Sequence, residues 1–229
     1  MAEMAHYREA HPLPFVITHY INLVCMCLLI ITGFNIHFPY WAGFMGMARG
    51  IHVFCGIIIT INVIVRIIMA FTIESAPANG TRQTQKDYKS WLPQADNRHQ
   101  FGAWIKFYLF VKKDHPLAGK FGVPQKISYC LIPILLLFMA YTGFCLWVPT
   151  STWGIFAAGT AAFGGIMSVR IIHYFFMFIF IIFMMIHIYM AIIEGGFPLL
   201  KMMFARKEHE GLTYDINTHD VAGEDKSIK

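Results

Sequence analysis

The stretch RIIHYFFMFIFIIFMMIHIYM, residues 170–190, decides the fold, because it is long and apolar enough to cross a membrane as one helix. It contains His173 and His187, which are fourteen positions apart. On an α-helix this spacing places the two imidazoles about 21 Å apart along the axis and on nearly the same face. An ionisable side chain inside a hydrocarbon layer indicates a functional site. The sequence therefore predicts two polar sites at two depths of one helix.

The composition predicts an integral membrane protein. The chain has 229 residues, of which 57% are hydrophobic and 14% are charged, whereas soluble domains have about 25% charged residues. No basic patch interleaved with aromatic residues is present, which argues against nucleic-acid binding. The five cysteines lie in apolar runs without Cys-x-x-Cys or Cys-x-x-Cys-His spacing, which argues against an iron–sulfur cluster and a covalently attached haem in this chain.

Four apolar runs are long enough to span a bilayer, and prolines or glycines at their borders suit helix ends. The predicted helices cover about 14–36, 50–72, 126–148 and 168–193. The long loop 73–125 carries eight Lys or Arg, while the loops after the first and third helices carry almost none. By the positive-inside rule the long loop and both termini are cytoplasmic. The fold class is thus an all-α membrane protein, a four-transmembrane-helix bundle, with residues 1–200 as one domain and 201–229 as a polar cytoplasmic tail.

Residues 98–113 in the loop alternate basic and aromatic side chains. This pattern favours an amphipathic helix lying on the cytoplasmic membrane surface. The alternative is a helix packed on the end of the bundle or on a partner subunit.

Four of the eleven histidines lie within the predicted spans, and they sort into two depths. His52 and His173 lie near the outer ends of their helices, and His19 and His187 lie near the inner ends. Facing histidines from two helices are typical of bis-histidine ligation of haem iron. The pattern predicts two haem b groups, the outer one held by His52 and His173 and the inner one by His19 and His187. For any single histidine the alternative is a hydrogen-bonded packing residue.

Arginines accompany the predicted ligands. Arg49 and Arg170 each precede an outer histidine by three residues, so they lie on the same helix face one turn outward. Guanidinium groups bind carboxylates bidentately, so haem propionates are their expected partners, and snorkelling at a helix end is the alternative. Arg66 follows His52 by fourteen residues. A charge inside an apolar run needs a partner, and we expect an inner-haem propionate to be that partner.

The chain resembles the b-type cytochrome subunit of membrane-bound [NiFe] hydrogenases and the related formate dehydrogenase gamma subunits. The resemblance covers nearly the whole chain and rests on THYINLVCMCLLIITGFNIHFPY, ARGIHVFCGIIITINVIVRIIMAF, YLFVKKDHPLAG and SVRIIHYFFMFIFIIFMMIHIYMAI. It implies the same four haem ligands, and an outer haem that accepts electrons from an iron–sulfur subunit of a hydrogenase or formate dehydrogenase, whose catalytic subunit completes the complex. It also implies an inner haem that reduces menaquinone or ubiquinone from the quinone pool. The resemblance places the protein in the inner (plasma) membrane of a prokaryote.

The resemblance also implies where quinone binds. The segment KFGVPQK, residues 120–126, resembles the Lys-Tyr-Asn-Ala-Gly-Gln-Lys segment of the formate dehydrogenase relatives. Phe121, Gly122, Val123 and Gln125 are the matching quinone candidates. Gly122 replaces the relatives' Asn and Pro124 replaces a Gly, so the hydrogen bonding to quinone differs here. Glu194 follows His187 by seven residues on the same face, where it could relay a proton to quinone or be a solvated helix-end carboxylate.

Three functions remain open from the sequence. The first choice is the electron-transferring subunit of a quinone-reducing [NiFe] hydrogenase, with no catalytic site of its own except the quinone site. The second is the gamma subunit of a formate dehydrogenase or related molybdenum enzyme. The third is a stand-alone cytochrome b561-type electron carrier. The long basic loop and the hydrogenase-like segments favour a subunit of a complex.

Overall fold

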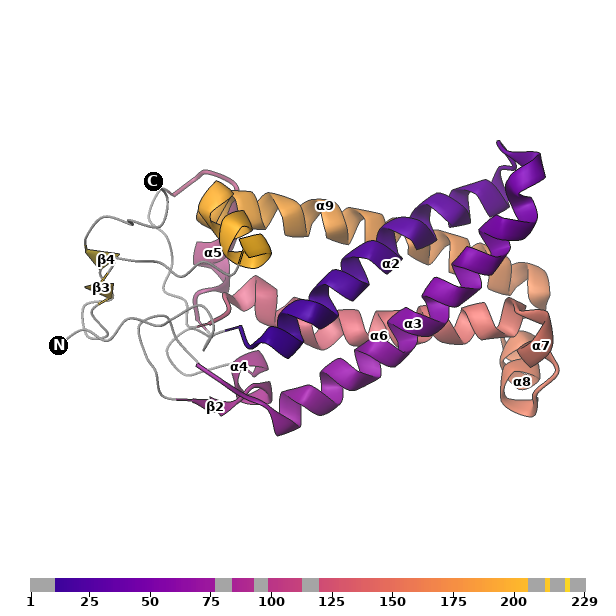
Figure 1. The fold of residues 1–229 in the computed structure, drawn as a ribbon, viewed down its shortest axis with the longest axis horizontal. Coiled ribbons are helices and arrows are strands. Elements are labelled where there is room, and N and C mark those ends of the chain that lie inside the picture. Colours follow the sequence, from indigo (N-terminus) through magenta and orange to yellow (C-terminus); the bar gives the residue numbers. More distant parts are fainter. Residues whose placement is uncertain are drawn as a thin grey trace. The chain divides into compact units, whose positions relative to one another are not determined.

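The computed structural model describes residues 11–76, 84–92, 99–112, 120–205, 213–214 and 221–222, with side chains described up to residue 193. Four long helices dominate this part of the chain (Figure 1). They are α2 (Leu13–His37), α3 (Met45–Thr72), α6 (Val123–Leu146) and α9 (Ile166–Ala205). All four are long and apolar enough to cross a membrane. The predicted all-α fold with four spans is confirmed.

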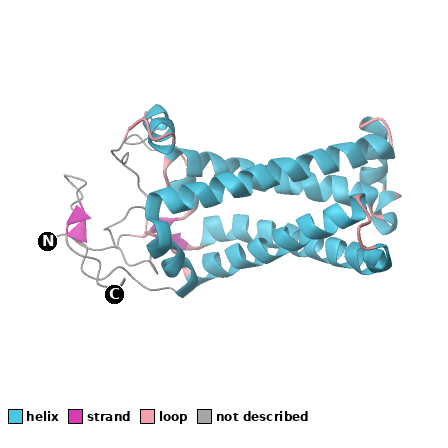
Figure 2. Ribbon diagram, turned by 90° about the horizontal axis from the view of Figure 1, so that it is seen from above, coloured by secondary structure: helices cyan, strands magenta, loops and turns pink. Residues whose placement is uncertain are grey.

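The connections and the C-terminal tail contain short elements, of which the sequence pattern predicted only the helix within residues 98–113 (Figure 2). A two-residue strand β1 (Glu74–Ser75) pairs antiparallel with β2 (Gln85–Lys86), and β3 (Thr213–Tyr214) pairs antiparallel with β4 (Val221–Ala222). The short helices are η1 (Ala42–Phe44), α4 (Tyr88–Trp91), α5 (Phe101–Tyr108), α7 (Val148–Ser151) and α8 (Gly154–Ala162).

Helix α9 is longer than expected. Its membrane span, Ile166–Ile193, agrees with the predicted 168–193, but the helix continues to Ala205. It passes through Gly195, Gly196 and Pro198, so the expectation that these residues end the helix was wrong. Glycine and proline lower helix propensity by only about 1 and 3 kcal/mol. These residues follow the membrane span, and only Pro198 removes a backbone donor, so the helix can continue through them.

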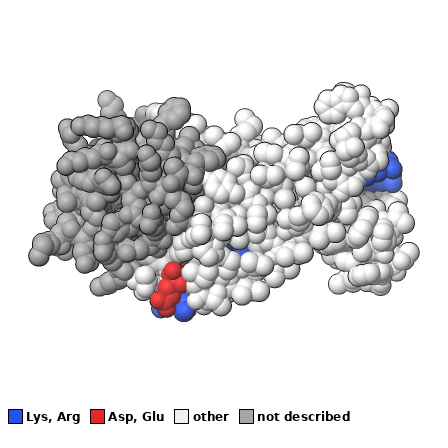
Figure 3. Space-filling view, viewed as in Figure 1, with Lys and Arg blue, Asp and Glu red and all other residues white. Residues whose placement is uncertain are grey.

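The spans expose apolar side chains. In the most apolar window of each span only 17–28% of the residues are buried, and uncharged atoms cover most of the described surface seen in Figure 3. Phe54, Ile134 and Phe175 are each more than half exposed. An apolar surface this extensive requires a lipid environment, and the helices satisfy their backbone hydrogen bonds internally, as a bilayer demands.

The described chain forms two compact units. The helical unit contains residues 18–65 and 132–186, which include most of α2 and α3, the later part of α6, the first half of α9, and η1, α7 and α8. Tyr141 on α6 donates a hydrogen bond to the carbonyl of Ile155 on α8, and Gly159 leaves the room that its phenol ring needs. The loop unit contains residues 1–17, 66–131 and 187–229.

A buried carboxylate organises the loop unit. Asp87 is fully buried between β2 and α4, and its oxygens lie 2.7 Å from Nη2 of Arg66 and 2.6 Å from Nζ of Lys120. Ser75 and the indole Nε1 of Trp91 also donate hydrogen bonds to it. One carboxylate thus joins the end of α3, the β1–β2 pair, α4 and the residue before α6.

The charges in this cluster determine its protonation. Burial raises the pKa of Asp87, but the charges and hydrogen bonds of Lys120 and Arg66 outweigh burial, so the pKa lies below the ordinary 3.8. Burial lowers the pKa of Lys120, and Asp87 offsets part of that effect. Because the Asp87 pKa is depressed in the folded state, its stabilisation is present above pH 3.8 and is lost as the pH falls through the folded value.

Helix α5 packs on the protein. Trp104 and Tyr108 are buried, and the Trp104 ring lies so close to Gly122 that a Cβ there would stand 2.8 Å from it. Phe101 and Ile105, which lie next to each other on the same helix, are exposed. The structure therefore shows the packed helix that the sequence offered as the alternative, with an apolar face left uncovered.

We expect Asp87→Asn to destabilise the protein by about 3–5 kcal/mol, because two buried cations lose their counter-charge. Thermal unfolding of the detergent-solubilised complex measures this effect. Glu74→Gln is the matched control, since Glu74 forms a 3.4 Å ion pair with Lys86 in which both side chains are more than 40% exposed. An exposed pair contributes about 0–1 kcal/mol. Equal melting temperatures for the two variants would contradict a supporting role for Asp87.

Candidate metal centre

Two of the predicted ligands face each other in the helical unit. His52 on α3 and His173 on α9 are half-buried, and their ring centroids are 6.2 Å apart with an interplanar angle of 64°. These residues lie 121 positions apart in the sequence, so the packing of the helices brings them together. The structure places this pair as the sequence predicted it.

The spacing of the rings suits an iron between them. Metal–imidazole bonds of about 2 Å on either side, with about 1 Å from each nitrogen to its ring centre, would place two centroids about 6 Å apart. Among the described residues there is no group of three or more His, Cys, Asp or Glu side chains that could bind a metal ion on their own. Two axial imidazoles therefore fit a cofactor that brings its own equatorial ligands, and haem is such a cofactor.

A threonine contacts each of these imidazoles. Oγ1 of Thr32 on α2 lies 3.0 Å from Nδ1 of His52, and Oγ1 of Thr142 on α6 lies 2.8 Å from Nδ1 of His173. Both threonines are buried. Sequence reasoning missed them, because a threonine in an apolar run carries no periodic signal that points to another helix.

A glycine also contacts each imidazole. A Cβ on Gly33 would stand 3.4 Å from Cε1 of His52, and a Cβ on Gly143 would stand 3.4 Å from Cε1 of His173. An added Cβ at either position would be in van der Waals contact with the imidazole, so each ring lies close to the backbone of α2 or α6.

Arg49 and Arg170 are exposed, and neither forms an ion pair or hydrogen bond with another residue of the described chain. Both guanidinium groups can thus reach an anionic partner. Their contact with haem propionates stays a prediction.

Arg66 has a different partner from the expected one. Its guanidinium pairs with Asp87 and lies over the ring of Phe15, with 4.0 Å from Cζ to the ring centroid, and near the rings of Trp91 and Tyr129. Asp87 thus satisfies the need for a counter-charge that the sequence analysis had assigned to a propionate. Asp87 lies in an aperiodic loop, 21 residues beyond Arg66, so the sequence pattern did not predict this partner. A contact of Arg66 with an inner-haem propionate stays a prediction.

His19 and His187 belong to different units, so their pairing stays a prediction. On α2, the turn that contains His19 is held by Asn62 of α3. The amide nitrogen of Asn62 donates hydrogen bonds to the carbonyl of Thr18, 2.8 Å away, and to Oδ1 of Asn22, 2.7 Å away. Interhelical amide hydrogen bonds of this kind stabilise helix pairs within membranes. Sequence reasoning did not predict this contact.

The predicted quinone segment, residues 120–126, includes the first residues of α6 and the three residues before it. Phe121 and Gly122 are buried, Val123 is half-buried, and Oε1 of Gln125 accepts a hydrogen bond of 2.9 Å from the backbone N–H of Gly122. This hydrogen bond caps the helix in the manner of a capping box. The side chain of Glu194 lies outside the described residues.

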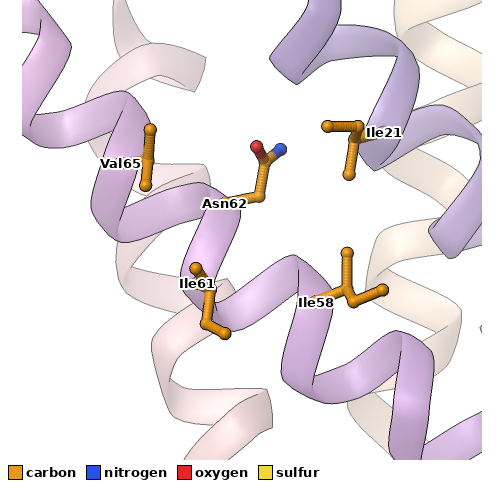
Figure 4. Close-up of a pocket in the computed structure, with 5 residues that line it drawn as sticks. All are labelled: Ile21, Ile58, Ile61, Asn62 and Val65. Carbon is orange, nitrogen blue, oxygen red and sulfur yellow. The ribbon is translucent and has the colours of Figure 1, made fainter.

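A pocket lies on the helical unit, lined by Ile21 of α2 and by Ile58, Ile61, Asn62 and Val65 of α3 (Figure 4). Its volume is about 170 Å³, below the roughly 300 Å³ at which ordinary small-molecule sites begin. It contains none of the predicted site residues.

His37, another histidine of the helical unit, stacks on Tyr174 with a centroid distance of 3.8 Å and an angle of 7°.

This chain is similar to known proteins over the region that contains its four long helices. Residues 10–205 match the family described as prokaryotic cytochrome b561. The probable Ni/Fe-hydrogenase 1 B-type cytochrome subunit of Escherichia coli K12 is 29% identical over 162 residues, which cover 63% of this chain and 62% of that protein. The probable Ni/Fe-hydrogenase B-type cytochrome subunit of Rhizobium leguminosarum bv. viciae is 27% identical over 198 residues, which cover 79% of each chain. With a facing histidine pair and four apolar helices inside the matched region, the chain belongs to the prokaryotic cytochrome b561 family.

Proposed function

We propose that this protein is the membrane-anchoring di-haem cytochrome b subunit of a respiratory [NiFe] hydrogenase. In this role it passes electrons from an iron–sulfur subunit across the membrane to quinone. The observation that carries the proposal is the His52–His173 pair, whose 6.2 Å ring separation suits bis-histidine ligation. The names of the Escherichia coli and Rhizobium leguminosarum relatives favour hydrogenase as the partner enzyme.

The residues have distinct roles in this proposal. Haem held by the histidines supplies reversible one-electron chemistry. His52 and His173 provide the axial nitrogens of one haem, and His19 and His187 those of the second. Arg49 and Arg170 neutralise the propionates of the outer haem, on the side of the membrane where electrons enter.

Quinone binds at the other end of the spans, on the cytoplasmic side, in this proposal. Phe121, Gly122, Val123 and Gln125 lie at the start of α6, and Lys120 and Asp87 form a buried ion pair beside them. Phe121 offers an aromatic ring for stacking, and its centroid is 5.1 Å from Nζ of Lys120. In this role Glu194 takes a proton from the cytoplasm and passes it to the reduced quinone.

The gamma subunit of a formate dehydrogenase is the second candidate, favoured by the segment KFGVPQK, residues 120–126. Both candidates use the same haem ligands. They differ in the soluble enzyme that donates electrons.

His187→Ala should remove one of two low-spin haem signals from the reduced-minus-oxidised spectrum, and His52→Ala should remove the other. Each change deletes one axial ligand of a different predicted pair. His37→Ala is the matched control, because His37 is exposed and stacks on Tyr174 rather than on another histidine. A full haem complement in His187→Ala would refute the pairing of His19 with His187.

The electron donor can be identified on the intact complex in membranes. We expect hydrogen to reduce both haems and formate to leave them oxidised, since only the partner enzyme oxidises the primary substrate. Anaerobic visible spectra with each donor in turn measure this difference. Reduction by formate alone would assign the chain to the second candidate, and reduction by neither would favour a stand-alone carrier.

A further inference from the structure

The His52–His173 centre is built from two copies of one arrangement. On α2, Thr32 and Gly33 of the triplet Thr-Gly-Phe contact His52 of the next long helix. On α6, Thr142 and Gly143 of a second Thr-Gly-Phe triplet contact His173 of the next long helix. Each histidine also follows an arginine by three residues. The sequence shows no long internal repeat, and only the packed helices make this short one recognisable.

The hydrogen bonds of the threonines determine which imidazole nitrogen carries the proton. A hydroxyl has one hydrogen to donate. Oγ1 of Thr32 lies 2.6 Å from the carbonyl oxygen of Leu28, and Oγ1 of Thr142 lies 2.9 Å from that of Met139. A carbonyl oxygen can only accept, so each hydroxyl donates to its own helix. Each Oγ1 must then accept a hydrogen bond from the histidine, which requires a proton on Nδ1.

Protonation at Nδ1 leaves the lone pair of Nε2 available in both rings. Nε2 is then the nitrogen that can bind a metal. The hydrogen bond also draws the Nδ1 proton away from the ring, which makes the imidazole a more basic ligand. A more basic axial ligand stabilises ferric over ferrous iron, and therefore lowers the reduction potential.

The glycines complete each copy of the arrangement. Gly33 and Gly143 lie beside the Cε1 side of each ring, where an added Cβ would stand 3.4 Å away, in van der Waals contact. Each imidazole is thus held on two sides by one Thr-Gly pair, without a charged residue at either side.

We propose that Thr32 and Thr142 are a matched pair of positioning residues that set the tautomer of His52 and His173 and together lower the reduction potential of the haem between them. This inference rests on the proposed bis-histidine haem. Neither threonine touches the iron, so each acts through its histidine.

Thr32→Val and Thr142→Val test the proposal, because valine keeps the shape of threonine and removes the acceptor oxygen. Potentiometric titration of the membrane-bound complex should show a higher potential for the His52–His173 haem in each variant. The shifts should be similar in size and larger in the double variant. The potential of the second haem should not change. Retention of the affected haem should fall by about 10- to 100-fold in affinity, as for other lost partners of metal ligands.

Three further variants separate hydrogen bonding from packing. Thr32→Ser and Thr142→Ser keep the hydroxyl and should keep the wild-type potential and haem content. Thr60→Val is the matched control on α3, since Thr60 donates to the carbonyl of Gly56 at 2.6 Å in the same way and has no imidazole among its hydrogen-bond partners. It should behave as wild type.

The outcomes discriminate clearly. Unchanged potentials in both valine variants, with the haem retained, would overturn the proposal, and so would serine variants that behave like valine. If the valine variants lose the haem, retention in the serine variants supports the proposal and loss in both overturns it. The proposed function fails separately, when His52→Ala and His173→Ala leave the haem spectrum intact.

Discussion

The high cost of an unpaired polar group in hydrocarbon is the constraint on which the structure depends. Three buried polar side chains of the helical unit, Thr32, Asn62 and Thr142, meet that constraint within the protein. Thr32 and Thr142 donate to carbonyls of their own helices and, with the proposed tautomers, accept from histidines on other helices. Asn62 divides its two donors between two acceptors on α2. The same hydrogen bonds that satisfy these groups also fix the rotation of each helix, and hence the direction in which the histidines point.

The charged residues obey the constraint in another way. Arg66 lies near the end of α3, where its guanidinium reaches Asp87 outside the span. Asp87 also pairs with Lys120, so two cations share one carboxylate and the cluster keeps an excess positive charge. Buried ion pairs often contribute little net stability, but removal of one partner is costly. The main role of the cluster is therefore to hold the β1–β2 pair and α4 in one position against the start of α6, beside the candidate quinone residues.

The sequence was sufficient for features that depend on length and period. Apolar runs located the four spans, and the depth of each histidine within its span predicted the His52–His173 pair. It was not sufficient for contacts between an aperiodic loop and a helix, as Arg66 with Asp87 shows. The end of α9 was also misjudged, because Gly195 and Pro198 were given more weight than the continuing helix required. One signal for the threonines was present: the triplet Thr-Gly-Phe occurs on both α2 and α6, but its meaning depends on which histidine each triplet faces.

Threonine is the physically favoured partner for a histidine ligand at this place. A carboxylate acceptor would pull the Nδ1 proton more strongly, but it would add a charge that is expensive to bury in a membrane. The threonine hydroxyl accepts from the histidine and donates to a carbonyl that can accept a second bond. It therefore orients the ligand and increases its basicity without a buried charge. Because both histidines are held in this way, the iron would experience two equivalent ligands.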